Sequence, residues 1–494
     1  MNTTDVINHI KKVNNLSFIS ALLEWDQETN MPHKGGPARS EQLGILAGIQ
    51  HDIKMNDDFR ESLKAIDLNS CTDEEQVILK DALKDISKSE KCPKRLVEEI
   101  AKYQSLGQQN WAEAKQKNDF QLFKPYLSRL IDLKREYAKA IAPDKAVYDT
   151  LLDDYEPNTT CADIEPVFTQ LRDFLVPFLE RIKSAKPTNT AFMNQAFPIE
   201  EQEDFGIQVI EEIGFDFDKG RVDLSVHPFC TNFSTNDVRI TTSFDENNFT
   251  KSFFGLMHES GHAMYEQGMD ETYHATAMAA PISLGIHESQ SRLWENMVGR
   301  SRQFWTHYFP EIKSRFKNEL KNVKFEDFLR GVNQVKASLI RTEADEVTYN
   351  LHVMIRFEIE QAIFNDNLPI DEIPRVWNEK YQSYLGITPP TDSEGCLQDV
   401  HWSLGLFGYF PTYTLGNIYS AQFFNQAKTD IKYLEDDFSK GDFSALKKWL
   451  NEHIHIHGKR YSAIECLQRS TGEGINPQHF INYLENKFSE LFNL

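Results

Sequence analysis

One stretch of the chain, residues 249–267 with the sequence FTKSFFGLMHESGHAMYEQ, combines a helical pattern with a metal-binding motif. Asn247 and Asn248 stand directly before it and are candidate helix caps. Residues 258–262 read HESGH, which is an HExxH pattern. Residues four apart lie one turn above each other on a helix, so the two histidines can present ring nitrogens to one ion. The spacing therefore predicts a helix that carries two metal ligands.

Glu259 follows the first histidine of this pattern, His258, and is rotated around the helix from it. It can accept a proton from a water molecule at the ion, which is the role of a general base. An HExxH pattern can also arise by chance, with His258 and His262 making ordinary hydrogen bonds, but the composition predicts only roughly 0.07 occurrences in this chain. Apolar residues before the motif, such as Phe253 and Leu256, are typical of a buried site. The pattern therefore indicates a metal centre.

A catalytic zinc ion takes three protein ligands and keeps its fourth position for water, so a third ligand must lie elsewhere in the chain. Glu266 is excluded because it lies about 12 Å from His258 along the axis of the same helix, at about 1.5 Å per residue. A second helix that opens at Pro281 would carry Glu288 and Glu295, which are seven residues apart and share one face. The spacing does not choose between these two carboxylates, and the alternative for either is a solvated surface residue.

Most of the chain shows the three- and four-residue periodicity of helices. The clearest windows are residues 125–141, 164–183, 325–365 and 444–457. The chain has no low-complexity linker and no internal repeat, which favours a single domain over residues 1–494. His453, His455 and His457 alternate in the last window, but residues two apart on a helix face different directions. We therefore expect packing and surface roles for them rather than a second metal site.

One region alternates like a strand instead. Val222, Leu224 and Val226 alternate with polar residues, and the alternation returns over residues 238–244 after a turn-rich segment, 232–236. The pattern predicts a small antiparallel sheet directly before the HExxH motif. A strand at this position could hold a peptide backbone by adding it to the edge of the sheet.

The composition is that of a folded protein, with 40% hydrophobic and 26% charged residues among 494. The 53 Lys and Arg residues against 75 Asp and Glu residues give a net charge of -22, which repels the phosphates of nucleic acids and of anionic lipids. We therefore expect neither nucleic acid nor membrane as a partner. The six cysteines are scattered without a CxxC pair, and the N-terminus lacks the continuous apolar run of a secretory signal. These features favour a cytoplasmic protein.

Six short motifs together resemble those of a known family. They are HPF at 227–229, DxRxT at 237–241, HExxH at 258–262, HESQ at 287–290, IRxxAD at 340–345 and GxxQDxHW at 395–402. Weaker matches extend towards both ends, with WDQ at 25–27, MP at 31–32, LDDYEP at 152–157 and IH at 454–455. By these motifs the chain resembles the carboxypeptidase Taq family of HExxH zinc carboxypeptidases along its whole length.

The resemblance implies a fold and an activity. The fold is a mainly α-helical, cleft-bearing single domain similar to neurolysin and angiotensin-converting enzyme, with the small sheet beside the metal site. The activity is metal-dependent removal of C-terminal residues from peptides with a free C-terminus, by a homodimer. The Glu of HESQ is the family's third zinc ligand, which here is Glu288, and Glu295 becomes a candidate for supporting the ligands. His and Glu ligands alone do not exclude Co2+ or Mn2+ in place of Zn2+.

The resemblance also suggests residues that contact the substrate. His401 and Tyr409 are candidates for stabilising the oxyanion, since related peptidases of this fold place a His and a Tyr there, and Tyr413 is a rival. The alternative for all three is packing in an aromatic-rich core. A carboxypeptidase must also bind the terminal carboxylate, for which a guanidinium offers two parallel hydrogen bonds. Arg341 is the first candidate for this anchor and Arg239 is the second.

The spacing within each motif predicts which side chains lie beside Arg239 and Arg341. In DxRxT, a strand period of two puts Asp237 and Arg239 on one face. In IRxxAD, Arg341 and Asp345 are four apart on the expected helix, so an ordinary ion pair between them is the alternative role. Three further motif residues are expected at the substrate: His227, Asp237 and Gln398.

Two other functions stay open at this point. A zinc oligopeptidase or endopeptidase of the same fold would share every residue of the HExxH site and would differ only at the closed end of the cleft. A non-catalytic peptide-binding scaffold is disfavoured, because such a protein has no use for Glu259 beside three metal ligands.

Overall fold

The computed structural model describes residues 1–186 and 190–494 and consists mainly of helices, as the periodicity predicted. In chain order the helices and strands are α1 (Thr3–Thr29), α2 (Gly36–Lys54), α3 (Asp57–Ala65), α4 (Asp73–Lys91), α5 (Lys94–Lys117), α6 (Phe120–Ile141), α7 (Val147–Leu152), α8 (Cys161–Lys183), α9 (Ile199–Ile213), β1 (Gly220–Leu224), β2 (Cys230–Ser234), β3 (Asp237–Thr242), α10 (Phe249–Gln267), α11 (Leu284–Arg292), α12 (Arg302–Arg315), α13 (Phe325–Val332), α14 (Tyr349–Phe364), α15 (Ile373–Leu385), α16 (Pro411–Asp430), α17 (Leu434–Phe438), α18 (Ser444–His453), α19 (Ala463–Thr471) and α20 (Gln478–Phe492).

Polar side chains start several of these helices. Asn2 and Asp5 exchange hydrogen bonds between side chain and backbone at the start of α1, and Thr72 and Glu75 do so at the start of α4. Such pairs satisfy N–H groups in the first turn that have no partner within the helix. The expected helix 249–267 is confirmed as α10, which begins after Asn248.

The predicted windows 125–141 and 164–183 are confirmed, because α6 and α8 contain them. The window 325–365 is wrong as one continuous helix, since α13 ends at Val332 and α14 begins only at Tyr349. Apolar residues such as Val335 and Leu339 recur between them, but most of the segment is half-buried or exposed, and its backbone is not helical apart from one short 3-10 turn. The expected helical spacing of Arg341 and Asp345 is therefore wrong.

The start of α14 explains this break. The carboxylate of Asp345 accepts the N–H groups of Val347 and Thr348 at 3.0 Å each, which starts a new helix rather than continuing the old one. Near the C-terminus the window 444–457 is also too long, because α18 ends at His453 and a short 3-10 segment follows.

The second site helix, α11, begins three residues later than expected. Ser283 rather than Pro281 caps it, with its side chain accepting the N–H of Ile286. The α-helix ends at Arg292, and a π-helical segment, Leu293–Val298, continues it. The wider turn of that segment changes the direction in which its side chains point.

The predicted sheet exists but is mixed rather than antiparallel. Its strand order is β1-β3-β2, with β1 parallel and β2 antiparallel to β3. The turn-rich segment 232–236 is mostly strand β2, whose residues are all half-buried and therefore show no alternation. Because this extra strand reverses the chain once more, β1 and β3 run in the same direction.

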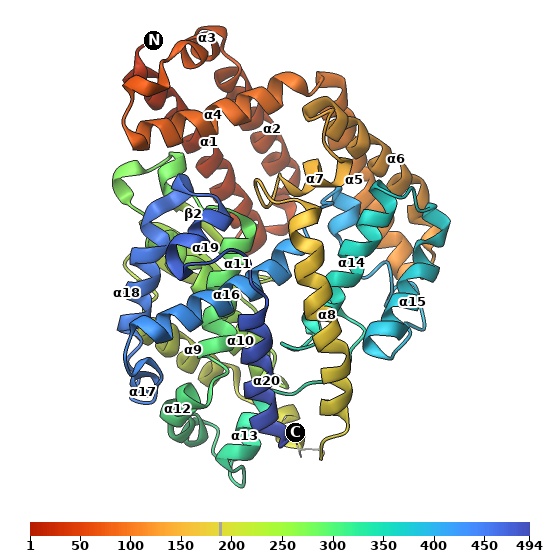
Figure 1. The fold of residues 1–494 in the computed structure, drawn as a ribbon, viewed down its shortest axis with the longest axis vertical. Coiled ribbons are helices and arrows are strands. Elements are labelled where there is room, and N and C mark those ends of the chain that lie inside the picture. Colours follow the sequence, from red (N-terminus) through yellow and green to blue (C-terminus); the bar gives the residue numbers. More distant parts are fainter. Residues whose placement is uncertain (187–189) are drawn as a thin grey trace.

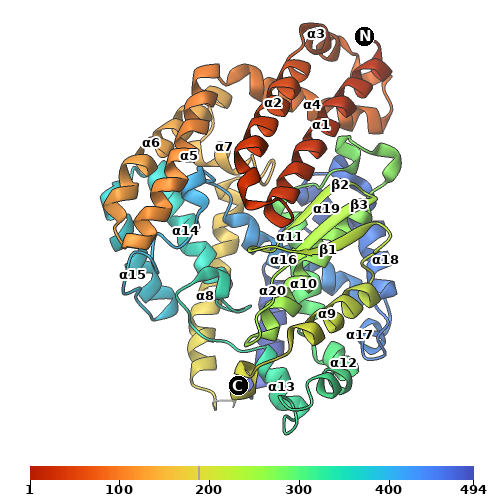
Figure 2. The ribbon, with the colours of Figure 1, turned by 180° about the vertical axis from the view of Figure 1, so that it is seen from behind.

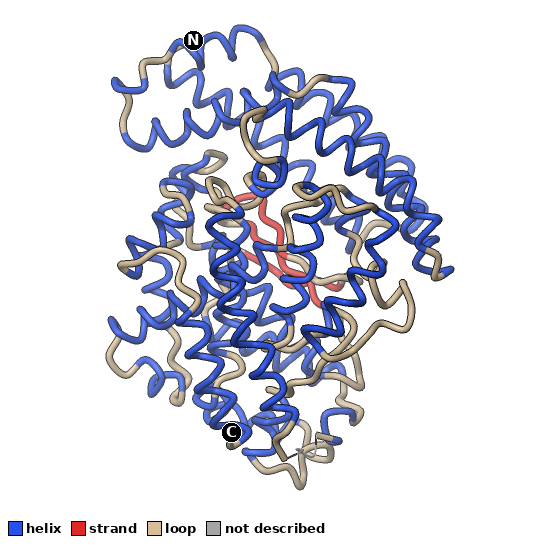
Figure 3. The backbone as a smooth tube through the Cα atoms, turned by 45° about the vertical axis from the view of Figure 1, so that its right-hand side comes forward, coloured by secondary structure: helices blue, strands red, loops and turns tan. Residues whose placement is uncertain are grey.

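Figure 3 shows the strands with helices around them, but the sheet is not fully buried, because every residue of β2 is half-buried and Arg221 and Leu224 of β1 are exposed. Val238 and Ile240 of β3 pack against Leu256 and Ala263 of α10. From behind, the strands lie beside α10, with α1 above them (Figure 2). The sheet therefore lies against the helix that carries the HExxH motif, as the resemblance to the family implied.

Two hydrophobic clusters divide most of the remaining interior. Helices α1, α3 and α4 form the top of the molecule in Figure 1 and share a small cluster that includes Val6, Phe59 and Leu79. A much larger cluster extends from α5 to α20. A single domain over residues 1–494 stays a prediction. Within the described residues, no helix combines the length and apolar character needed to cross a bilayer.

Candidate active site

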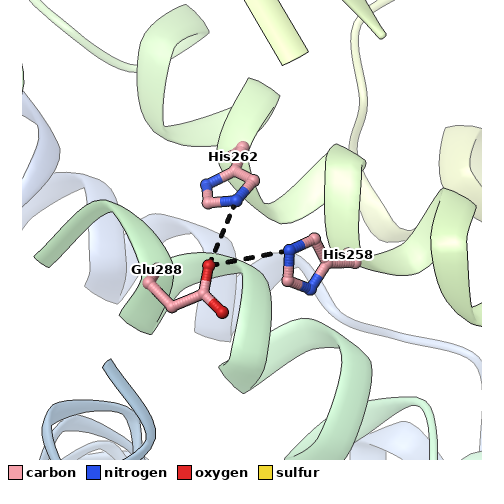
Figure 4. Close-up of side chains that lie close together, drawn as sticks. All are labelled: His258, His262 and Glu288. Carbon is pink, nitrogen blue, oxygen red and sulfur yellow. Dashed lines mark ion pairs between the residues drawn. The ribbon is translucent and has the colours of Figure 1, made fainter. Parts of the chain in front are cut away.

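Helices α10 and α11 cross at close range and bring His258 and His262 of the first helix against Glu288 of the second (Figure 4). The close approach depends on Gly261, because a Cβ atom there would lie 2.6 Å from the carbonyl oxygen of Gln290. No side chain fits at such a distance, so the glycine in HESGH serves the helix crossing.

The three side chains converge on one point. The Nε2 atoms of His258 and His262 lie 3.6 and 3.5 Å from the same oxygen of Glu288, Oε2. These separations are too long for hydrogen bonds. They match an ion between the atoms, because tetrahedral ligands about 2.1 Å from a metal are about 3.4 Å apart. Two imidazoles and one carboxylate oxygen therefore fit a divalent metal ion.

Two other acidic residues of this region have different partners. Glu266 accepts hydrogen bonds from Asn232 and His287, at 2.8 Å each, and lies outside the group of three. Glu295 accepts a hydrogen bond from Nδ1 of His258 at 3.0 Å. The helical spacing did not decide which of two carboxylates is the third ligand, and the structure separates them. Glu288 faces the Nε2 atoms of both histidines, whereas Glu295 contacts the opposite nitrogen of His258.

Arg292 ties these two carboxylates together. Its Nε donates to Oε1 of Glu288 at 2.6 Å, and its Nη1 donates to Glu295 at 3.2 Å. Burial raises the pKa of Glu288, but the charges of Arg292 and His258 outweigh it and hold that pKa well below the usual range. Burial is likewise outweighed at Glu295, whose pKa falls to about 2. Both carboxylates are therefore charged at neutral pH.

The histidine rings differ in their surroundings. Burial lowers the pKa of His262 to about 3, so its imidazole is neutral and keeps a lone pair for a metal. Burial also opposes the charged form of His258, but the charge of Glu288 and the hydrogen bond to Glu295 raise its pKa overall. Carboxylates thus face both ring nitrogens of His258, that of Glu288 on the side of Nε2 and that of Glu295 on the side of Nδ1.

Glu259 lies beside the group of three without joining it. Its side chain is buried and makes no hydrogen bond or ion pair with any described residue. Burial raises its pKa to about 7, although the nearby His258 favours the charged form. A carboxyl group with such a pKa can both take up and release a proton near neutral pH.

The structure brings the three expected aromatic and imidazole side chains together. Nε2 of His401 lies 3.2 Å from the hydroxyl of Tyr413, and the ring centroids of His401 and Tyr409 are 5.3 Å apart. Burial lowers the pKa of His401 to about 4, which leaves the ring neutral. Burial raises the pKa of Tyr409, and the charge of Glu288 raises it further. Tyr409 is therefore close enough to the candidate metal ligand Glu288 for the two groups to interact electrostatically.

Arg341 is part of a buried arrangement of two arginines and one aspartate. Its Nε and Nη2 lie 2.9 Å from one oxygen of Asp399, while Arg356 binds the other oxygen at 2.6 Å. Gln398 accepts the backbone N–H of Arg341 at 2.9 Å. One carboxylate thus faces two guanidinium groups, which leaves an excess of one positive charge. The ordinary ion pair with Asp345 does not form, because that carboxylate binds backbone N–H groups instead.

Arg239 and Asp237 share one face of β3, as the strand period predicted, and form an ion pair with an Nε–Oδ1 distance of 2.8 Å. The guanidinium carbon lies 4.3 Å from the ring centroid of Trp25 in α1. The carboxylate of Asp237 therefore neutralises the charge of Arg239. His227 is exposed in the loop between β1 and β2.

Reasoning from the sequence missed several residues of this region. Arg292 had a usable signal, because it follows Glu288 by four residues and such pairs meet on a helix. Tyr349, which accepts a hydrogen bond from Arg341, fell inside the window read as one helix. Arg300, which donates to Glu295 at 3.2 Å from beyond the π-helical segment, gave no recognisable pattern. Of the three alternating histidines near the C-terminus, for which packing and surface roles were expected, His455 is buried and its Nε2 lies 2.9 Å from Oε1 of Gln290.

Comparison with known proteins gives a consistent result. Residues 5–488 match the family model described as carboxypeptidase Taq (M32) metallopeptidase. The chain is 39% identical over 486 residues to carboxypeptidase 1 of Bacillus subtilis, covering 98% of this chain and 97% of that one. It is 38% identical over 491 residues to thermostable carboxypeptidase 1 of Thermus thermophilus, covering 97% and 96%.

A solved structure, the M32 carboxypeptidase from Deinococcus radiodurans, superposes with a TM-score of 0.97 at 36% identity, covering 99% of each chain. The expected mainly α-helical fold is confirmed by this likeness. Given the whole-length family match, the chain belongs to the carboxypeptidase Taq (M32) metallopeptidase family and is a metallocarboxypeptidase, a peptide hydrolase that depends on a divalent metal ion.

Proposed function

We propose that this metallocarboxypeptidase uses Zn2+ held by His258, His262 and Glu288 to remove residues one at a time from peptides with a free C-terminus. The observation that carries this proposal is the convergence of two Nε2 atoms on one carboxylate oxygen, at 3.5 and 3.6 Å, beside a buried Glu259. When bound, the ion supplies Lewis-acid chemistry, activating a water molecule and polarising the scissile carbonyl. Co2+ or Mn2+ could serve with the same ligands.

Glu259 is the proposed general base. Its carboxylate takes a proton from the attacking water and delivers it to the leaving amine, and a pKa of about 7 suits both steps. It has no described hydrogen-bond partner to compete for that proton. Glu295 holds the ring of His258 so that Nε2 points towards the metal position.

His401 and Tyr409 are the proposed donors to the oxyanion of the tetrahedral intermediate. Both are neutral at neutral pH, since burial lowers the pKa of His401 and raises that of Tyr409, and each keeps one hydrogen to donate, an N–H on the imidazole and the O–H on the phenol. Hydrogen-bond donors placed where charge develops contribute strongly to catalysis. Tyr413, which bonds to His401, is the rival for the same role.

Arg341 is the proposed anchor for the terminal carboxylate. Asp399 is shared with Arg356, so the pair of arginines retains one uncompensated positive charge. The guanidinium of Arg341 has five N–H donors, and the described contacts occupy three of its nitrogens with one donor each. Two N–H groups therefore remain for a carboxylate. Gln398 fixes the backbone of this residue.

The sheet side of the site has a secondary role in this proposal. Arg239 is the weaker candidate for the anchor because Asp237 already neutralises its charge. Asp237 and His227 are proposed to contact the substrate from the sheet and from its exposed loop.

The experiment that tests this function compares a peptide acid with its C-terminal amide. Mass spectrometry should show a ladder that shortens from the C-terminus of the acid, and a chelator should abolish it. The amide should resist cleavage, because it lacks the charge that Arg341 would bind. Arg341→Ala should lower kcat/KM for the acid by about thirty- to several-thousand-fold and leave the amide nearly unchanged. Equal rates for acid and amide on the unmodified protein would favour an endopeptidase.

Two properties of the whole protein belong to the same proposal. The resemblance to the family supports a homodimer, which light scattering would test. All six cysteines are free, and the net charge is -22, which supports residence in the reducing cytoplasm without nucleic acid or membrane partners.

A further inference from the structure

Tyr349 lies between two arginines that belong to separate networks. It is the first residue of α14 and only 6% exposed. The guanidinium carbon of Arg292 is 4.4 Å from its ring centroid, and Nη1 of Arg341 donates to its hydroxyl at 3.0 Å. One side chain therefore contacts both arginines.

These two arginines hold different parts of the site. Arg292 binds Glu288, one of the three candidate metal ligands, with an Nε–Oε1 distance of 2.6 Å. Arg341 binds Asp399 and is the proposed anchor for the substrate carboxylate. Tyr349 is thus a direct physical link between the metal ligands and the anchor.

The electrostatics of the tyrosine suit this position. The electron-rich face of an aromatic ring attracts the cation over it, which is Arg292. The hydroxyl oxygen accepts a hydrogen bond from the second cation, Arg341. The two positive charges, which repel each other, thus each contact a different part of Tyr349: Arg292 contacts the ring and Arg341 contacts the hydroxyl.

The tyrosine is itself fixed in place. Its backbone N–H donates to the carbonyl of Asp345 at 2.9 Å, and the carboxylate of Asp345 holds the two residues before it. Its ring meets that of Tyr413 edge to face, with centroids 6.1 Å apart. Asp345 therefore fixes the backbone position of Tyr349. The IRxxAD motif thus supplies both Arg341 and the residue that positions its tyrosine partner.

A small displacement of the anchor would change the product. One residue of an extended peptide spans about 3.3–3.6 Å, so a shift of that size moves a different peptide bond to the metal. We propose that Tyr349 is a specificity-determining positioning residue that fixes Arg341 relative to Glu288 and so restricts hydrolysis to the terminal peptide bond. This inference rests on the proposed anchoring role of Arg341.

The test uses Tyr349→Phe, which removes the hydroxyl and keeps the ring, and Tyr349→Leu, which removes both. Tyr384→Phe is the matched control, because its ring also carries an arginine and its hydroxyl also bonds to an ion pair, that of Arg172 and Glu358. For each metal-loaded protein, kcat/KM is measured on a matched peptide acid and amide. Mass spectrometry then measures the fraction of terminal dipeptide released.

Tyr349→Phe should reduce the preference for acid over amide by about ten- to a hundred-fold, through a higher KM for the acid. Tyr349→Leu should in addition release dipeptide, while Tyr384→Phe should match the unmodified protein. A purely structural role would lower the acid and amide rates together, and that result would overturn the inference. An unmodified protein that does not prefer acid would instead overturn the anchoring role of Arg341. If Tyr349→Leu fails to fold, the ratio for Tyr349→Phe still decides.

Discussion

Replacing Glu295 by Gln should weaken metal binding although Glu295 is not a proposed ligand. The carboxylate accepts three hydrogen bonds, from His258 at 3.0 Å and from Arg292 and Arg300 at 3.2 Å each. An amide has only one oxygen to accept them, and its NH2 group must then face a donor. At least one of the three contacts is lost, and the charge that supports the basicity of His258 disappears.

The loss can be estimated from comparable sites. Removing a group that orients a metal-bound histidine typically lowers metal affinity by about 10- to 100-fold, which is about 1.4–2.7 kcal/mol. The upper end applies here, because Arg292 also orients Glu288 and would lose one of its two carboxylate partners. Turnover at saturating metal should change much less than the affinity, since the proton acceptor Glu259 is untouched.

The affinity is measured by titrating the metal-free protein with Zn2+ against a competing chelator. Glu358→Gln provides the control, because that carboxylate also accepts hydrogen bonds from an arginine and a tyrosine but lies in α14 away from the site. An unchanged zinc affinity for Glu295→Gln, or an equal loss for Glu358→Gln, would refute the supporting role of Glu295.

Three further changes have defined outcomes. Glu259→Gln should keep the metal, by elemental analysis, and lower kcat by about 10^2- to 10^4-fold, because it removes the proton acceptor and no ligand; metal loss would contradict this. Gly261→Ala forces the crossing helices apart, so it should lower the free energy of unfolding by about 1–3 kcal/mol, measured by thermal unfolding, and weaken metal binding. Gly255→Ala on the same helix is the control, because its Cβ would meet only one atom, at 4.0 Å, and it should change neither quantity. Burial raises the pKa of Glu156 to about 7, so its protonated form is favoured in the folded state. The stability from this group is fully present below the usual glutamate pKa and should fall by about 3 kcal/mol as the pH rises from about 4.5 to about 7, because the unfolded chain loses this proton first. Unfolding curves at pH 5 and 8 should diverge less for Glu156→Gln, and equal divergence would show that Glu156 is already charged.

The metal centre was largely predictable because its signal is local. The spacing of His258 and His262 on one helix fixes their common face, and it excluded Glu266 by distance alone. The choice between Glu288 and Glu295 was not predictable from spacing, because seven residues return to the same face of an α-helix. The structure separates them by passing into a π-helical segment at Leu293, after Glu288 and before Glu295.

The anchor region was not predictable because its partners are distant in sequence. Arg341 and Asp399 are 58 residues apart, and no periodic pattern links them. The window 325–365 was predicted as one helix because apolar residues such as Val335 and Leu339 recur where the backbone is not helical. The only local signal for the break was Asp345, whose carboxylate accepts the N–H of Thr348 just before α14. The antiparallel arrangement predicted for the sheet was wrong because strand β2 was missed. All residues of β2 are half-buried, so its sequence shows no alternation of apolar and polar residues.

A crystal structure of the metal-loaded Glu259→Gln variant with an uncleaved peptide bound is the most direct test of the proposed site. It should show the ion about 2.0–2.2 Å from Nε2 of His258, Nε2 of His262 and a carboxylate oxygen of Glu288. The terminal carboxylate should lie within about 3 Å of the Arg341 guanidinium, with the last peptide bond at the metal. An ion bound by Glu295 in place of Glu288, or a peptide whose terminal carboxylate points away from Arg341 into solvent, would contradict it.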